Sequence, residues 1–61
     1  MKKILIIVKQ NESGKFEDLL ADYNMQENIS TVLDIDNFTQ FFIRVNNEDE
    51  ELLLIDLKKE L

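Results

Sequence analysis

The chain lacks cysteine, histidine, proline and tryptophan, and Gly14 is its single glycine. Without cysteine or histidine, we expect no zinc site, no thiol nucleophile and no Ser-His-Asp triad. A chain without disulfides is typical of a reducing compartment. The apolar run at residues 4–8 is shorter than a signal-peptide core of roughly 7–15 residues or a membrane span of about 20. We therefore predict a cytoplasmic protein with no membrane partner and no cofactor.

Acidic residues dominate the charge of the chain. It has 13 Asp and Glu against 7 Lys and Arg, for a net charge of −6 and a pI near 4.4. Such a chain is repelled by phosphate backbones, so we expect no direct binding to nucleic acid. A partner bound by charge is expected to be a basic protein surface. The alternative is that the acidic side chains are only solvated and keep the protein soluble.

The length and composition predict one small domain covering residues 1–61, because 61 residues with 44% hydrophobic content suffice for a single core. Residues 3–9 (KILIIVK) form a continuous β-branched run, which predicts a strand buried on both faces. Residues 10–14 form a loop that ends at the glycine. Residues 15–23 repeat apolar side chains at helical spacing, which predicts an amphipathic helix with Ser13 as its N-cap.

The middle of the chain predicts a β-hairpin. Residues 29–35 alternate between apolar and polar side chains, as in a strand with two different faces. Asp36 and Asn37 are typical turn residues. Residues 38–45 are rich in aromatic and β-branched side chains and predict the second strand of the hairpin.

The C-terminal segment allows two interpretations. As a strand, residues 52–57 would pair back on residues 38–45 across a loop at 46–51. As a helix, it would have Asn47 as N-cap, Glu50 in a capping box, and a buried stripe of Leu53, Leu57 and Leu61. We favour the strand, because it completes the sheet. The predicted fold is α+β: a small, mainly antiparallel sheet in β-α-β-β-β order with one packed helix.

Three catalytic or ligand-binding patterns are incomplete. Gly14-Lys15 lacks the first glycine and the hydroxyl residue of a phosphate-binding loop. Asp34, Asp36 and Asn37 resemble the start of a calcium loop but lack its glycine and final glutamate. Paired carboxylates need a cleft, for which so small a domain has little room. We therefore predict a protein that is not an enzyme and has no metal site.

The four consecutive acids at residues 48–51 are the most distinctive chemical feature. They gain the fold little, because adjacent like charges repel. They are interpreted either as a solvated chain reversal or as an anionic patch that imitates a nucleic-acid backbone. In the hairpin, Asp34 and Asp36 would lie at the opposite end of the neighbouring strand and extend an acidic rim.

The aromatic residues of the second hairpin strand occupy both of its faces. Phe38 and Phe42 alternate with Phe41 and Ile43, and one helix covers one face of a small sheet. Apolar surface is then left for self-association or for a partner. In the alternative interpretation, the N-terminal segment covers the second face.

A short segment carries a family resemblance. Residues 39–47 read TQFFIRVNN and precede the acidic cluster. This stretch resembles a type II-A anti-CRISPR protein, whose strand and turn read T-Q-x-x-I-R-V-N-N before an acidic turn and another strand. Asp49 stands where that family has a turn glycine. The family also has an N-terminal helix and two helices after its sheet, whereas this chain begins with a predicted strand.

The resemblance implies an inhibitor that occupies the basic DNA-binding surface of an RNA-guided nuclease. It implicates the turn residues Asn46, Asn47, Glu48, Asp49 and Glu50. The charge pattern alone adds Glu51, Asp36 and Asp34.

The sequence therefore predicts a non-enzymatic inhibitor that binds a nucleic-acid-binding nuclease, such as a CRISPR effector, through an acidic, nucleic-acid-mimicking surface. Two alternatives stay open. One is a small regulator, such as an antitoxin or host-enzyme inhibitor. The other is a structural protein, or a homodimer, that associates through an apolar sheet face.

Overall fold

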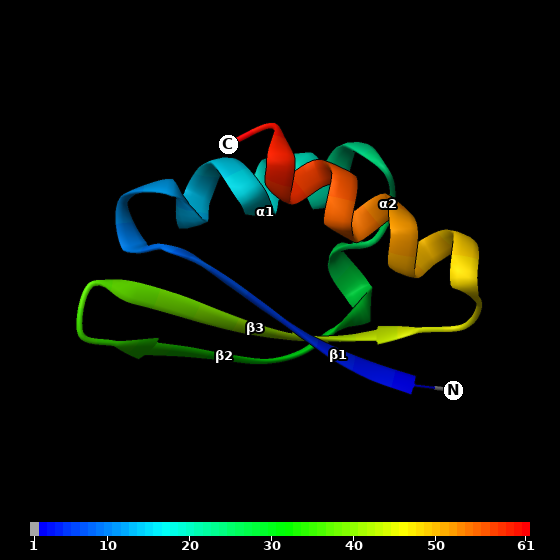
Figure 1. Ribbon diagram of the computed structural model, residues 1–61, viewed down its shortest axis with the longest axis horizontal. Helices are drawn as coiled ribbons and strands as arrows, with labels where there is room; N and C mark the ends of the chain where they lie inside the picture. The colour runs from blue at the N-terminus through cyan, green and yellow to red at the C-terminus, as the bar shows by residue number, and fades with distance from the viewer. Residues whose placement is uncertain (1) are drawn as a thin grey trace.

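The computed structural model describes residues 2–61. It contains a three-stranded antiparallel sheet in the order β1-β3-β2 and two α-helices, both on the same side of the sheet (Figure 1). Two short 3₁₀ segments, η1 and η2, precede α1 and β2. The elements are β1 (Lys2–Lys9), η1 (Gln10–Glu12), α1 (Ser13–Asp22), η2 (Gln26–Asn28), β2 (Ile29–Ile35), β3 (Phe38–Val45) and α2 (Glu48–Lys59). In the described part of the chain, no helix has the length and apolar character needed to cross a membrane.

The predicted hairpin is confirmed, with both strands at the predicted bounds. β2 and β3 pair in antiparallel fashion and are joined by a two-residue turn between Ile35 and Phe38. Asp36 has a φ of 56°, in the left-handed region, where Asp and Asn are tolerated better than other non-glycine residues. The register of β2 shifts between Ile29 and Thr31, which marks a bulge near its start.

β1 is an edge strand, and the prediction that both its faces are buried is wrong. It pairs with β3 from Lys2↔Val45 to Lys9↔Phe38. Ile6 and Val8 point to the helices and are buried, whereas Leu5 and Ile7 are exposed on the other face. The reason is that both helices pack on one face of the sheet, so the apolar run of β1 exceeds what a single covered face requires.

The strand predicted at residues 52–57, and with it the β-α-β-β-β order, is wrong, because this segment belongs to α2. The observed order is β-α-β-β-α, with two packed helices where one was predicted, and the helical alternative for this segment is confirmed. β1 already occupies the side of β3 on which a C-terminal strand would have paired. The helix has four acids in its first turn and two lysines in its last, which suits the helix dipole. Leu54 and Leu57 are buried, and Leu53 and Leu61 pack against the core.

α1 confirms the predicted amphipathic helix, but Ser13 is not its N-cap. Ser13 is the first helical residue, and its Oγ donates a hydrogen bond of 2.9 Å to the Gln10 carbonyl oxygen. The preceding 3₁₀ turn, η1, feeds directly into the helix, so the cap position falls on Glu12. Phe16 and Leu20 are fully buried, and the Phe16 ring lies 5.1 Å from that of Phe41, centroid to centroid.

The core lies between the helices and the covered face of β1 and β3. Thr39 is the polar side chain buried within it, and its hydroxyl donates a hydrogen bond of 2.7 Å to an oxygen of Asp34. The buried apolar residues are Ile6, Val8, Phe16, Leu20, Met25, Phe41, Ile43, Val45, Leu54 and Leu57. β2 contributes little to this core, since its residues beyond Ile29 are exposed.

Candidate partner-binding site

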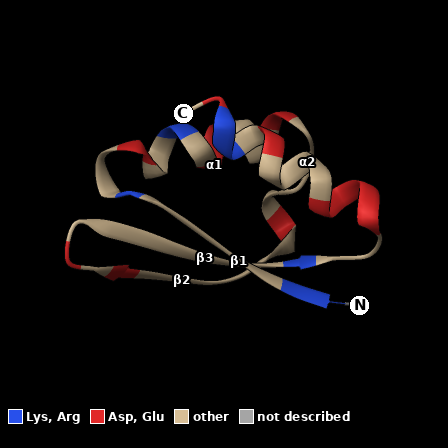
Figure 2. Cartoon of the chain, viewed as in Figure 1, with Lys and Arg blue, Asp and Glu red and all other residues tan. Residues whose placement is uncertain are grey.

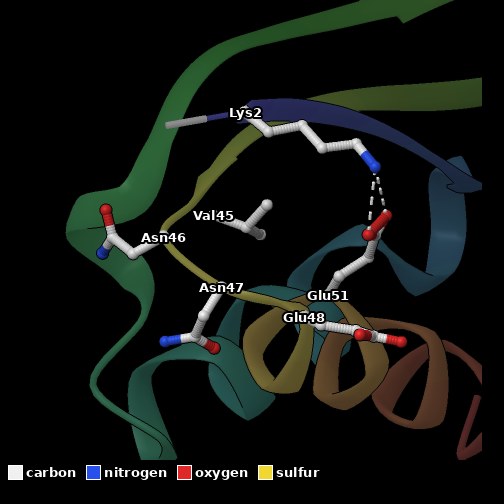
Figure 3. A pocket seen from close by; sticks show the side chains of 6 residues that line it. All are labelled: Lys2, Val45, Asn46, Asn47, Glu48 and Glu51. Atoms are coloured by element: carbon white, nitrogen blue, oxygen red, sulfur yellow. Dashed lines mark hydrogen bonds and ion pairs between the residues drawn. The ribbon is translucent and has the colours of Figure 1, made fainter.

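The candidate residues at 46–51 gather where β3 ends and α2 begins. This junction forms a surface hollow with Val45 at its base and polar side chains around it (Figure 3). The hollow is lined by Lys2, Val45, Asn46, Asn47, Glu48 and Glu51. The chain reverses direction here in two residues, so six predicted site residues lie close together.

Two of these residues form a variant of the capping box at the start of α2, in which the glutamate bonds the residue before the N-cap. Asn47 is the N-cap, and its Oδ1 accepts a hydrogen bond of 2.9 Å from the backbone N–H of Glu50. The Glu50 carboxylate reaches back and accepts a bond of 2.8 Å from the backbone N–H of Asn46. Each bond satisfies a backbone donor at the junction. The side chains of Asn47 and Glu50 therefore serve the fold.

Glu51 is tied to the first strand. The Lys2 Nζ donates to both Glu51 carboxylate oxygens, at 3.0 and 3.1 Å (Figure 3). The side chain of Lys2 is 65% exposed, so this is a surface ion pair and stabilises the fold weakly. Sequence reasoning did not include Lys2 in the site, because the pairing of β1 with β3 places it there and that pairing leaves no local signal.

Glu48 and Asp49 are the free acids of the junction. Both are exposed in the first turn of α2, and within residues 2–61 no hydrogen bond or ion pair holds either carboxylate. The positive end of the helix dipole favours a negative charge at this position. These two carboxylates are therefore stable where they stand and available to an external cation.

Asp34 and Asp36 lie at the other end of the molecule. Asp34 is opposite Thr39 and bonded to it, and Asp36 is in the β2–β3 turn. The eight residues of β3 separate this turn from the start of α2, a span of roughly 25 Å at about 3.3 Å per residue. The structure thus places Asp34 and Asp36 apart from the other six candidate residues.

Acidic and basic residues are divided between two layers of the fold, the helices (the helical layer) and the sheet. All the acids except Asp34 and Asp36 lie outside the strands and the hairpin turn, on or beside the helices (Figure 2). Four of the seven basic residues are on strands: Lys2, Lys3, Lys9 and Arg44. The helical layer therefore carries the negative charge of the chain, and the sheet has a positive balance.

Comparison with protein-family models, curated proteins and solved structures yields no match. The resemblance of residues 39–47 to the anti-CRISPR family accordingly stays a hypothesis. Among residues 2–61, no group of three or more acidic side chains is arranged to hold a metal ion. The polar side chains that the hollow offers to a partner are charged groups and amides on an open surface.

Proposed function

We propose that this chain is a non-enzymatic binding protein that inhibits a nucleic-acid-binding nuclease. Its acidic helical layer, with Glu48 and Asp49 at the start of α2, occupies a basic surface that the nuclease uses for DNA. A CRISPR effector nuclease is the partner that the resemblance at residues 39–47 suggests. The inhibitor competes with DNA for arginine and lysine side chains and does not itself contact the nucleic acid.

The observation that carries this proposal is the large unpaired negative charge of the helical layer. Among residues 2–61 a single ion pair, Lys2–Glu51, neutralises an acid. The fold therefore uses few of its 13 acids. Concentrated charge of one sign raises the rate of encounter with an oppositely charged partner and fixes its orientation.

The first test is DNA cleavage by a purified type II CRISPR effector with its guide RNA, with this protein added before the DNA. We expect inhibition at stoichiometric concentrations that weakens as salt is raised, because screening acts on exposed charges. Unchanged cleavage with effectors from several hosts would rule out the proposed partner.

The second test locates the inhibitory surface with matched variants. Replacing Glu48 with Gln and Asp49 with Asn removes two charges without disturbing the capping box of Asn47 and Glu50. The control replaces Asp18 and Asp22, which are exposed on α1, with Asn and so reaches the same net charge. We expect the first variant to lose inhibition and the control to retain it. Equal loss in both would show that net charge, and not the α2 junction, determines binding.

A further inference from the structure

The face of the sheet opposite the helices is apolar and uncovered. In the antiparallel register, Leu5 pairs with Phe42 and Ile7 with Gln40 on this face, and Leu33 and Ile35 flank the same strand from β2. Five large apolar side chains here are between 39% and 48% exposed: Leu5, Ile7, Leu33, Ile35 and Phe38. In Figure 1 both helices lie on the other side of the sheet. We call this surface the open sheet face.

The open sheet face is large for so small a chain. At about 200 Å² for a fully exposed large apolar side chain, the five residues present on the order of 450 Å² of apolar surface. Contiguous apolar patches of roughly 300–600 Å² are the largest that typical monomers show, and such patches are often binding sites. A patch of this size on so small a chain is therefore a candidate contact surface.

The charged strand residues on the open sheet face are all cations, and Asp36 is in the turn at one end of it. By strand alternation, Lys3 and Arg44 lie at one end of the face and Lys9 lies at the other. Arg44 also donates a hydrogen bond of 3.1 Å to the Glu27 carbonyl oxygen, which leaves its charge unneutralised. Two open faces stacked on each other would bring cations against cations in either orientation. The charge pattern therefore favours an apolar partner surface that also carries acids.

The outer surface of α2 has that chemistry. Leu52 and Ile55 are 52% and 41% exposed, and they lie on the side of the helix that faces away from the core residues Leu54 and Leu57. Glu48 and Asp56 lie at i−4 and i+4 from Leu52 and share its side of the helix. We call the surface formed by Glu48, Leu52, Ile55, Asp56 and Lys59 the outer α2 face. Lys59 is its one cation and lies in the last turn.

We infer that the open sheet face binds the outer α2 face of a second copy of this chain. Leu52 and Ile55 of one copy pack on the apolar side chains of the other, and Glu48 and Asp56 approach Lys3 and Arg44 at one end of the open sheet face. The two surfaces lie on opposite sides of the molecule, so the contact is heterologous: each copy still has one face free, and the assembly grows head to tail. This inference does not rest on the proposed function, because it concerns a contact between copies of the chain.

The contact is small, which sets the expected affinity. The area that it buries lies at the low end of the range for specific interfaces, so we expect a dissociation constant on the order of tens of micromolar or higher. At physiological ionic strength, charges farther apart than about 8 Å are screened, so the net charge of −6 on each copy does not prevent association. Light scattering between about 10 µM and about 1 mM should show the average mass rising steadily above the 7.2 kDa of one chain.

Two complementary variants test the arrangement. The sheet-face variant combines Leu5→Glu with Leu33→Glu and keeps an intact outer α2 face. The helix-face variant combines Leu52→Gln with Ile55→Gln, which adds no charge, and keeps an intact open sheet face. All four side chains are exposed, so both variants should fold, which circular dichroism checks. We expect each variant alone to be monomeric and an equimolar mixture to form a 1:1 heterodimer that grows no further.

Three results would overturn the inference. The first is a wild-type protein that stays monomeric at about 1 mM. The second is a helix-face variant that still self-associates, which would indicate symmetric stacking of the open sheet faces. The third is a mixture of two folded variants that stays monomeric. NMR spectra of the mixture with one variant isotope-labelled at a time locate the contact. On mixing, amide chemical shifts should change in the strands of the helix-face variant and in α2 of the sheet-face variant.

Discussion

The replacement of Asn47 by alanine tests the local argument on which the C-terminal helix depends. It removes the oxygen that accepts a hydrogen bond from the Glu50 N–H at 2.9 Å. It also removes a hydrogen bond that helps to hold Glu50 where its carboxylate accepts the bond of 2.8 Å from the Asn46 N–H. Loss of an N-cap of this kind costs about 1 kcal/mol of folding free energy, within a range of roughly 0.5–2.

That loss is a large fraction of the stability available. At about 0.05–0.15 kcal/mol per residue, a chain of this length is stable by roughly 3–9 kcal/mol. For a domain of this size, 1 kcal/mol shifts the melting temperature by about 4–8 °C. We therefore expect Asn47→Ala to melt about 4–8 °C below the wild type, as followed by far-ultraviolet circular dichroism.

Asn46→Ala is the matched control, because within residues 2–61 the Asn46 side chain makes no hydrogen bond and only its backbone N–H is used. We expect its free energy of unfolding to change by less than about 0.5 kcal/mol. Asn47→Ser, which restores an acceptor, should recover most of the loss. Equal stability of the two alanine variants in urea titrations would refute the capping argument.

Three further substitutions test the core, the buried hydrogen bond and the turn by urea denaturation. Leu54→Ala leaves a cavity at a fully buried site and should lower the free energy of unfolding by about 2–5 kcal/mol. Leu52→Ala, at an exposed site, should lower it by less than about 1 kcal/mol. Similar losses in the two variants would contradict the packing. Asp34→Ala leaves the buried Thr39 hydroxyl unpaired and should cost about 1–3 kcal/mol, more than Thr39→Val, which removes the buried donor itself. Asp36→Val should destabilise by roughly 1–2 kcal/mol because of the positive φ, whereas Asp36→Gly should not.

Local patterns predicted the hairpin well. The alternation of residues 29–35, the Asp36-Asn37 pair and the β-branched run at 38–45 each act over neighbouring residues, and a two-residue turn fixes the register of such a pair. The bulge at the start of β2 was not predicted, because it depends on how Ile29 and Thr31 align with β3.

Local patterns also indicate the C-terminal helix, because Asn47 and Glu50 suit a capping box and the leucines are at helical spacing. The sequence favours a strand there because residues 38–45 need a second neighbour to complete the sheet. β1 supplies that neighbour from the far end of the chain. Pairing between distant segments leaves no periodic signal, so the sequence alone could not show that the position next to β3 was already taken.

The candidate site contains six acids beside Asn46 and Asn47, and the structure separates the acids by role. Glu50 caps a helix, Glu51 pairs with Lys2, and Asp34 accepts a bond from Thr39. Glu48 and Asp49 remain exposed. A run of four acids looks uniform in the sequence because the distinction depends on which backbone donors and which cations lie within reach of each carboxylate.

The strand order β1-β3-β2 has a consequence for how the chain reaches its native state. The central strand, β3, is joined to β2 by a two-residue turn, but its nearest partner in β1, Lys9 opposite Phe38, is separated from it by η1, α1, η2 and β2. Closing the longer loop loses more chain entropy, so we expect the hairpin to form first and β1 to dock late in folding. Destabilising changes at the β1–β3 contact should then accelerate unfolding, whereas those in the hairpin should slow folding.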